Sequence, residues 1–254
     1  MRPMTIRLAA PEDADAVVAL IRQSFRPQDL DLTIYGCAGI SAYLHMEFAL
    51  PRAFSASAYL VAVIEDRIAG FVEMRAGESG PYLNYIATSP AWRGAGVGRE
   101  MLAAALREID PPAGSEFTLD VFEHNQIALD WYRRSGFRSL ERMAFWCVAD
   151  GVLAQPPCGT LAERVRILDL PQADATHRAF GFSSFRLADR GRAFTIGRLG
   201  ERWFRVTEGE LLRRPEVLHA LQSLDPHREI LFHGAGETAD LSPLLWSIRM
   251  GRQL

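Results

Sequence analysis

Leu83–Gly98, which reads LNYIATSPAWRGAGVG, is the stretch that decides the expected fold. An apolar, β-prone run over Tyr82–Ala87 predicts a strand, and Ser89-Pro90 ends it. A glycine-rich turn follows at Arg93–Gly98. Beyond the turn, apolar residues recur every three or four positions, which predicts a helix over Val97–Ile109.

A strand, a glycine-rich turn and a helix N-terminus together predict an anion site. The first turn of a helix has backbone N–H groups without partners inside the helix, and the helix dipole adds positive character there. Glycines let phosphate oxygens approach the main chain because they carry no Cβ. We therefore expect a phosphate or pyrophosphate seat at Ala95–Arg99. The alternative is a connector whose glycines only let helix and strand pack closely.

Two other phosphate motifs are excluded by inspection. The Rossmann fingerprint G-x-G-x-x-G fails because Arg99 stands where a third glycine must follow Gly94 and Gly96. The Walker A pattern fails because no Lys-Ser/Thr pair is present, which also disfavours a nucleotide-dependent phosphotransferase. The pattern that remains is Arg-x-x-Gly-x-Gly, formed by Arg93, Gly96 and Gly98. It resembles the acetyl-CoA pyrophosphate loop of the GCN5-related N-acetyltransferase (GNAT) superfamily.

A second stretch, Leu119–Phe137, reads LDVFEHNQIALDWYRRSGF and resembles the second signature of the same superfamily. That signature is a strand ending before Asn-x-x-Ala-x-x-x-Tyr-x-x-x-Gly-Phe. Its positions are filled by Asn125, Ala128, Tyr132, Gly136 and Phe137. The two motifs stand in the family's order and spacing, and the resemblance covers about residues 5–148.

The expected fold class is α/β (α+β). The predicted element order β, α, α, β, β, β, α, β, α, β implies a mixed sheet with helices on both faces, and the resemblance implies that this sheet is splayed. We expect an acetyl-CoA-binding domain at 1–149, a linker at 150–160 and a smaller C-terminal α+β region at 161–254. That region has a predicted hairpin at 193–207 and a helix at 215–224, but no Arg-x-x-Gly-x-Gly. We interpret it as a degenerate GNAT half-repeat; the alternative is an unrelated α+β appendage.

The composition excludes several classes of protein. A net charge of −3 over 254 residues is not the excess of positive charge expected of a protein that binds nucleic acid or an anionic membrane. The three cysteines and six histidines show no metal-ligand spacing, so we expect no metal. No apolar run approaches the ~20 residues of a membrane span. We expect a cytoplasmic protein, monomeric or homodimeric, whose partner is an amine rather than a nucleic acid or a membrane.

The resemblance implies that acetyl-CoA lies between the central strand and the next one. Asn125 either caps its helix or binds the cofactor, and both roles stay open. The other implied cofactor residues pair with the pantetheine through their backbone or hold the pyrophosphate. They are Ile86, Ala87, Thr88, Arg93, Gly94, Ala95, Gly96, Val97, Gly98 and Arg99.

Tyr132 is the expected general acid. When an amine attacks the thioester, CoA leaves as a thiolate, and a phenol near that sulfur can donate a proton. The pKa of tyrosine, about 10, is near enough to that of a thiol for this transfer. The alternative is a tyrosine that only packs in the core.

The general base is less determined. The family often places a carboxylate on the central strand, where this chain has Asn84 and Tyr85. The candidates are Asp120 and Glu73, on neighbouring strands, and Glu123 at a strand end; a water chain reaching Asp120 or Glu73 is an equal option.

Together these features predict an acetyl-CoA-dependent N-acetyltransferase. It would transfer an acetyl group to a primary amine of a small molecule or peptide by direct attack on the thioester. The alternative is a non-catalytic acyl-CoA-binding or regulatory module of the same fold.

Overall fold

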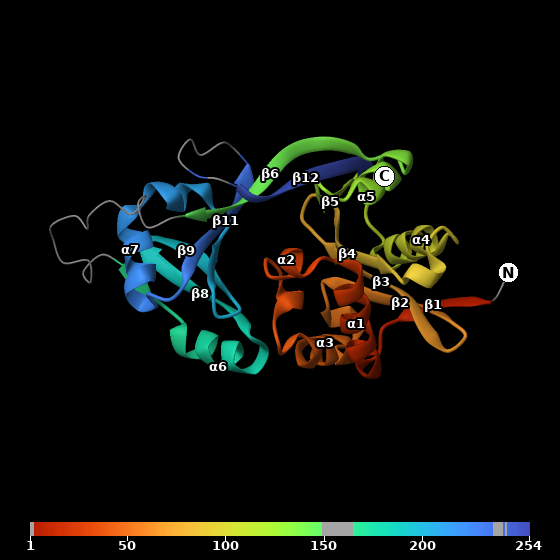
Figure 1. Cartoon of the computed structure of the whole chain (residues 1–254), viewed down its shortest axis with the longest axis horizontal. Coiled ribbons are helices and arrows are strands. Elements are labelled where there is room, and N and C mark those ends of the chain that lie inside the picture. The colour runs from red at the N-terminus through yellow and green to blue at the C-terminus, as the bar shows by residue number, and fades with distance from the viewer. Residues whose placement is uncertain (1–2, 149–164, 236–240, 242) are drawn as a thin grey trace. The chain divides into compact units, whose positions relative to one another are not determined.

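The computed structural model describes residues 3–148, 165–235, 241 and 243–254 (Figure 1). By its internal contacts the chain divides into two compact units. Unit 1 comprises 1–31, 40–140 and 248–254, and unit 2 comprises 32–39 and 141–247. The expected linker at 150–160 lies outside the described residues.

This division differs from the expected boundary at 149 in two ways, and each has a local cause. The last segment, Ile248–Leu254, belongs to unit 1 because Arg249 forms a two-pronged ion pair with Asp120 there. The segment Leu32–Gly39 belongs to unit 2. Its last residue donates a backbone hydrogen bond to the Phe180 carbonyl at 3.2 Å.

Unit 1 follows the predicted element order, with an additional short helix, α2, and a strand from the C-terminal part of the chain, β12. Strands β1 to β4 form an antiparallel ladder, β4 pairs with β5 in parallel, and β12 follows β5 in the strand order. The unit boundaries fall inside β6 and β12. The elements are β1 (Met4–Leu8), α1 (Ala14–Ser24), α2 (Pro27–Leu30), α3 (Ile40–Ala49), β2 (Ser57–Ile64), β3 (Arg67–Ala76), β4 (Pro81–Thr88), α4 (Val97–Ile109), β5 (Glu116–Phe122), α5 (Gln126–Arg134), β6 (Arg138–Val148) and β12 (Pro243–Gln253).

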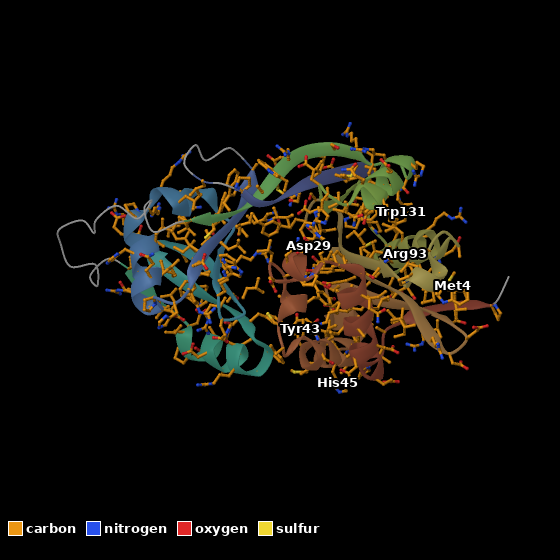
Figure 2. All side chains as sticks on the ribbon, in the orientation of Figure 1. Met4, Asp29, Tyr43, His45, Arg93 and Trp131 are labelled. Carbon is orange, nitrogen blue, oxygen red and sulfur yellow. The ribbon has the colours of Figure 1, made fainter. Side chains whose placement is uncertain are left out.

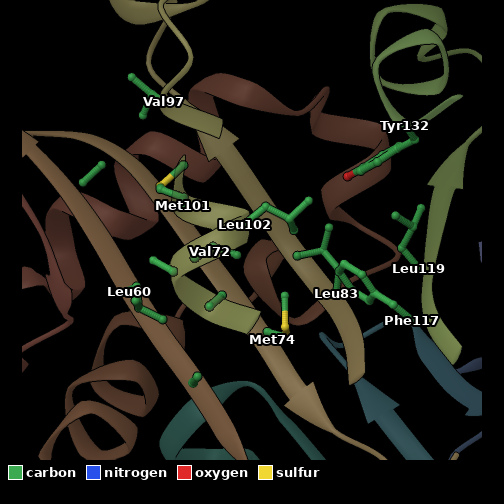
Figure 3. Packing of buried hydrophobic residues seen from close by; sticks show 14 of the residues in the cluster. Leu60, Val72, Met74, Leu83, Val97, Met101, Leu102, Phe117, Leu119 and Tyr132 are labelled. Carbon is green, nitrogen blue, oxygen red and sulfur yellow. The ribbon is translucent and has the colours of Figure 1, made fainter. Parts of the chain in front are cut away.

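The two faces of this sheet carry different side chains. Val72 and Met74 of β3 are fully buried in the same cluster as Met101 of α4 and Tyr132 of α5 (Figure 3). The alternation of a strand sends the residues before and between them to the opposite face. There Phe71 packs against Phe48 of α3, with ring centroids 6.3 Å apart. This mixed sheet between helices confirms the expected fold class.

Unit 2 repeats the order of a strand, a helix, three strands, a helix and a strand. Its sheet runs β6-β11-β10-β9-β8-β7, and β10 pairs with β11 in parallel over all four of its residues. The hairpin and the helix predicted for this region are present, whereas β7, α6 and β8 were not predicted. The elements are β7 (Val165–Ile167), α6 (Leu170–Phe180), β8 (Phe182–Asp189), β9 (Arg192–Leu199), β10 (Trp203–Val206), α7 (Pro215–Leu224) and β11 (Glu229–Ala235).

No helix in the described ranges combines the length and the apolar character that crossing a membrane requires. Within the same ranges, no group of three or more His, Cys, Asp or Glu side chains is placed to hold a metal ion. Cys37 and Cys147 form no disulfide with another described residue, and Cys158 lies outside the described residues.

Candidate active site

The central feature of unit 1 is a parallel strand pair that separates. Tyr82 pairs with Thr118 and Leu83 with Leu119, and there the pairing of β4 with β5 stops. Both strands continue, β4 to Thr88 and β5 to Phe122, without further pairing between these described residues. We call the point just beyond Leu83 and Leu119 the fork. Figure 3 shows these two leucines side by side and their strands diverging beyond them.

A β-bulge in β4 begins at the fork. Glu73 of β3 pairs with Tyr85 and Met74 pairs with Leu83, so Asn84 is an extra residue with no partner position. A bulge bends its strand and increases the local twist. This accounts for the departure of β4 from β5 directly after Leu83.

The backbone of β4 beyond the fork directs the peptide groups of alternate residues away from β3. The N–H of Ser89 donates to the Ala69 carbonyl at 2.9 Å, which fixes the alternation of the antiparallel ladder. Ala87 therefore directs its peptide groups toward β3, whereas Ile86 and Thr88 direct theirs toward the opened side. Of the three predicted pantetheine residues, Ile86 and Thr88 present their backbone there.

The turn after β4 presents backbone donors that no described residue accepts from. Gly94 and Gly96 have φ angles of 77° and 84°, which glycine adopts without strain, and Gly96 is the N-cap of α4. Within the described chain, five N–H groups of this turn donate no hydrogen bond. They belong to Gly94, Gly96, Val97, Gly98 and Arg99.

Two side chains border the turn. Arg93 donates from Nε to the Thr88 carbonyl at 3.3 Å, which ties the turn to the end of β4. A Cβ on Gly98 would lie 3.5 Å from the Trp131 ring, so this tryptophan of α5 lies directly beside the turn. Figure 2 labels both residues. Within the described chain, the predicted anion seat is thus a bordered turn in which, of the amides at Ala95–Arg99, only that of Ala95 donates a hydrogen bond, to the Trp92 carbonyl at 3.4 Å.

Tyr132 projects from α5, and its side chain is 6% exposed. Its ring packs against Phe137 and Trp131, with centroids 5.6 Å and 4.9 Å away. The hydroxyl has no hydrogen-bond partner among the described residues, yet it is not one of the fully buried atoms that lack one. In Figure 3 it points from α5 toward the region between the two strands. Burial raises the pKa of Tyr132, so the phenol is protonated at neutral pH.

Glu73 lies on β3 with 2% exposure. Its Oε1 atom accepts hydrogen bonds from Arg75 Nε at 2.9 Å and Nη2 at 2.8 Å. The same oxygen accepts from Asn84 Nδ2 at 2.7 Å, so the bulge residue is anchored to this carboxylate.

Asp120 lies on β5, directly past the fork. Arg249 of β12 donates to it from Nε at 2.9 Å and from Nη2 at 2.8 Å. The hydroxyl of Tyr82 donates to it at 3.0 Å. Glu73 and Asp120, two of the predicted bases, are therefore each ion-paired with an arginine. Glu123, the third candidate, lies in the loop after β5.

The Acetyltransferase (GNAT) family model matches residues 22–137. Residues 22–137 form a GNAT acetyltransferase domain. This range contains the fork, the glycine turn and Tyr132, and it lies within unit 1 apart from the segment 32–39.

Solved structures share the fold over the whole chain at low identity. A GCN5-related N-acetyltransferase from Sphaerobacter thermophilus is 13% identical, with a TM-score of 0.61 and coverage of 100% of this chain and 97% of that chain. A tandem GNAT protein from the clavulanic acid biosynthesis pathway is 10% identical, with a TM-score of 0.64 and coverage of 99% and 98%. A GCN5-related N-acetyltransferase from Kribbella flavida is 12% identical, with a TM-score of 0.55 and coverage of 100% and 71%. No match emerged among curated proteins.

Asn125 caps helix α5 of the GNAT domain. Its side-chain oxygen accepts from the Ala128 N–H at 3.2 Å, which satisfies one of the free donors of the first helical turn. The capping role anticipated from the sequence is thus present, and the cofactor role stays a prediction.

An aromatic group at the fork of the GNAT domain was not predicted from the sequence. The Phe25 ring lies 6.1 Å from that of Tyr85 on β4 and 6.5 Å from that of Phe122 on β5. It therefore bridges the two separated strands. Phe25 directly follows α1 and continues the apolar stripe of that helix in the sequence. The sequence therefore predicted only core packing for it and gave no indication of its contacts with Tyr85 and Phe122.

A buried carboxylate on α2 of the GNAT domain was missed as well. Asp29, 2% exposed, pairs with Arg26 at 2.7 Å and with His124 Nε2 at 3.2 Å. The sequence indicated only a mixed, proline-containing loop over Arg26–Tyr35, because the histidine partner is distant along the chain.

Proposed function

We propose that this chain is an acetyl-CoA-dependent N-acetyltransferase that acetylates a primary amine of a small molecule or peptide. The observation that carries the proposal is the set of unused N–H groups at Gly94–Arg99, next to a strand pair that separates. A helix N-terminus with free amides suits a diphosphate. The backbone of Ile86 and Thr88 suits an extended amide arm, which can pair there as an added strand would.

The residues present also suit the transfer itself. The amine nitrogen forms a bond to the thioester carbonyl carbon, the carbon–sulfur bond breaks, and the thiolate takes a proton. Tyr132 is the proposed donor of that proton, because its phenol is protonated and makes no competing hydrogen bond with the described residues.

The acceptor is protonated as an ammonium and must lose a proton before its nitrogen can attack. In this proposal the proton does not pass directly to a carboxylate. Glu73 and Asp120 each accept two N–H donors from one arginine. Direct transfer to either carboxylate competes with those bonds. We therefore favour transfer through water, with Glu73 and Asp120 as positioning residues for the two arginines.

The test is a thiol-release assay with acetyl-CoA against simple amines, polyamines, aminoglycosides, amino acids and peptides. Amine-dependent release that collapses in Tyr132→Phe supports the proposal. Binding of CoA without turnover of any amine would favour the non-catalytic module instead. Absence of CoA binding would contradict both.

A further inference from the structure

A carboxylate on α3 reaches the sheet of unit 1 without a cation of its own. Glu47 accepts a hydrogen bond from the hydroxyl of Tyr59 on β2 at 3.2 Å. Tyr43, one turn earlier on the same face of α3 and labelled in Figure 2, hydrogen-bonds the same carboxylate. No cationic side chain is paired with Glu47 among the described residues. Two phenols therefore orient this carboxylate, and neither neutralises its charge.

The side chain of Tyr59 connects Glu47 with the fork along one face of the sheet. Tyr59 stands directly opposite Glu73 of β3, and Glu73 stands directly opposite Tyr85 of β4. Residues that oppose each other on neighbouring antiparallel strands share a face. We call Tyr59, Glu73 and Tyr85 the cross-strand row. Because Tyr85 lies just past the fork, the row leads from the carboxylate of Glu47 to the place where β4 leaves β5.

The charges at the cross-strand row do not cancel. Arg75 donates to Glu73 from Nε and Nη2, which neutralises that buried acid. Burial, and after it the charges of Glu73 and Glu47, raise the pKa of Tyr59, so this phenol remains a hydrogen-bond donor at neutral pH. Two acids and one arginine leave one negative charge over, on Glu47. Because Glu47 is half-buried, a cation bound there would offset the cost of its lost hydration.

The cation that Glu47 suits is not the nitrogen that reacts. A nitrogen attacks the thioester only after it has lost its proton and with it its charge, whereas a carboxylate binds a charged donor best. The two positions are also apart. Tyr59 is on β2 and the fork opens beside β4, two strands away, which is about 10 Å. One ammonium group therefore cannot serve both positions.

We propose that the acetyl acceptor is a diamine or polyamine, with one amino group at the fork and a second, charged amino group at Glu47. The alkyl chain between them follows the cross-strand row, with the half-buried rings of Tyr43 and Tyr85 as its apolar contacts. This inference rests on the proposed function, because it names the acceptor of that reaction.

The test compares each diamine with the amino alcohol of equal length, which keeps the reacting amine and replaces the second ammonium by an uncharged hydroxyl. The probes are terminal diaminopropane, diaminopentane and diaminooctane with aminopropanol, aminopentanol and aminooctanol, assayed by thiol release from acetyl-CoA. We expect kcat/KM to be at least about tenfold higher for the diamines, through a lower KM. The preference should be largest for diaminooctane, whose chain best matches the distance between the two positions.

Glu47→Gln keeps an oxygen for the two phenols and removes the charge. It should raise KM for the diamines about tenfold and leave kcat, the amino alcohols and the KM of acetyl-CoA unchanged. Glu47→Asp keeps the charge and should retain the preference for diamines. Glu108→Gln is the matched control, because Glu108 on α4 is also half-buried but already has a cation, Arg52 at 3.1 Å. It should leave the preference unchanged.

Equal kcat/KM for diamines and amino alcohols in the wild type would overturn the acceptor proposal, and this comparison does not depend on any variant folding. Equal losses of kcat for both kinds of acceptor in Glu47→Gln would also overturn it, because Glu47 would then be a proton acceptor or a structural residue. If no amine releases thiol, the proposed function fails separately. Calorimetric titration of diaminooctane into the CoA-loaded protein then decides: binding that Glu47→Gln weakens supports the cation site, whereas unchanged binding or none contradicts it.

Discussion

The two units contain the same parallel strand pair in different states. In unit 1, β4 and β5 pair at two positions and then separate. In unit 2, β10 and β11 pair from Trp203 with Glu229 through Val206 with Phe232, which is the whole of β10. In each unit the first strand of the pair is the last of three consecutive antiparallel strands. A helix, α4 or α7, lies between the two paired strands in the sequence. The element order alone therefore does not make a cofactor site.

The segments that follow the first strand of each pair, β4 or β10, also differ between the two units. Unit 1 has the glycine turn with unused amides before α4. Unit 2 has a 3-10 helix at Gly209–Arg213 flanked by Glu208, and Glu210 within it is paired with Arg214. Glu208 and Glu210 are also ion-paired with Arg192, so carboxylates and guanidinium groups already fill this position with their own pairs. An anion seat requires both the separated strands and the open turn, and unit 1 alone has both among the described residues.

The largest expected effect comes from Gly96→Val, because Gly96 has a φ of 84° and its amide is one of the unused donors. We expect affinity for CoA to fall about 100-fold, since two charge-assisted hydrogen bonds are worth about 3 kcal/mol. Gly191→Val is the control, because Gly191 of unit 2 has a φ of 82° and free space around it. Similar weakening by both variants, measured by calorimetry, would mean that backbone strain and not the seat is responsible.

Tyr132→Phe should lower kcat about 100-fold with little change in the KM of acetyl-CoA. The melting temperature should stay near that of the wild type, because the hydroxyl has no partner among the described residues. Burial raises the pKa of this phenol, and an acid acts in its protonated form. The wild-type kcat should thus show no fall from Tyr132 ionisation between about pH 7 and 10. A descending limb there that the variant removes would contradict this assignment.

Gly39→Ala should destabilise unit 2. A Cβ at this position would lie 2.4 Å from Phe180 Cα and 2.5 Å from the Ala179 carbonyl oxygen. Overpacking of this kind costs about 2 kcal/mol, which lowers the melting temperature by roughly 5 °C. Gly209→Ala is the control, because its Cβ would make an ordinary 3.5 Å contact with the Phe232 ring. Equal melting temperatures for both variants would show that the close approach of Gly39 is not rigid.

The smallest effect is expected from the double variant Glu208→Gln, Glu210→Gln. If acidic side chains alone closed unit 2 to a diphosphate, their removal would create a second site. Because β10 and β11 are paired over the whole of β10, we expect no added site. Isothermal titration of the variant with CoA checks this, and a second binding event would mean that the strand pairing is not the barrier.

The parts that were predictable from the sequence depend on local patterns. The strand, turn and helix around Gly94–Gly98 follow from periodicity and glycine placement, and Tyr132 follows from its spacing within one helix. Helix α6 was missed because only Ala173 is buried on it, which leaves no apolar stripe to detect.

The parts that were missed depend on pairing between distant residues. Arg249 and Asp120 are separated by 129 positions, and no local pattern indicates their contact. The bulge at Asn84 is defined only by the register of β3 against β4. The segment Leu32–Gly39 reads as a loop of the first domain, and its membership of unit 2 follows from contacts such as the one with Phe180.

The most direct measurement is the stoichiometry of CoA binding to the full chain by isothermal titration calorimetry. The separated strands and open turn occur once among the described residues, so we predict one CoA per chain, abolished or severely weakened in Gly96→Val. Two equivalent sites per chain, or one site that Gly96→Val leaves intact, would contradict the account.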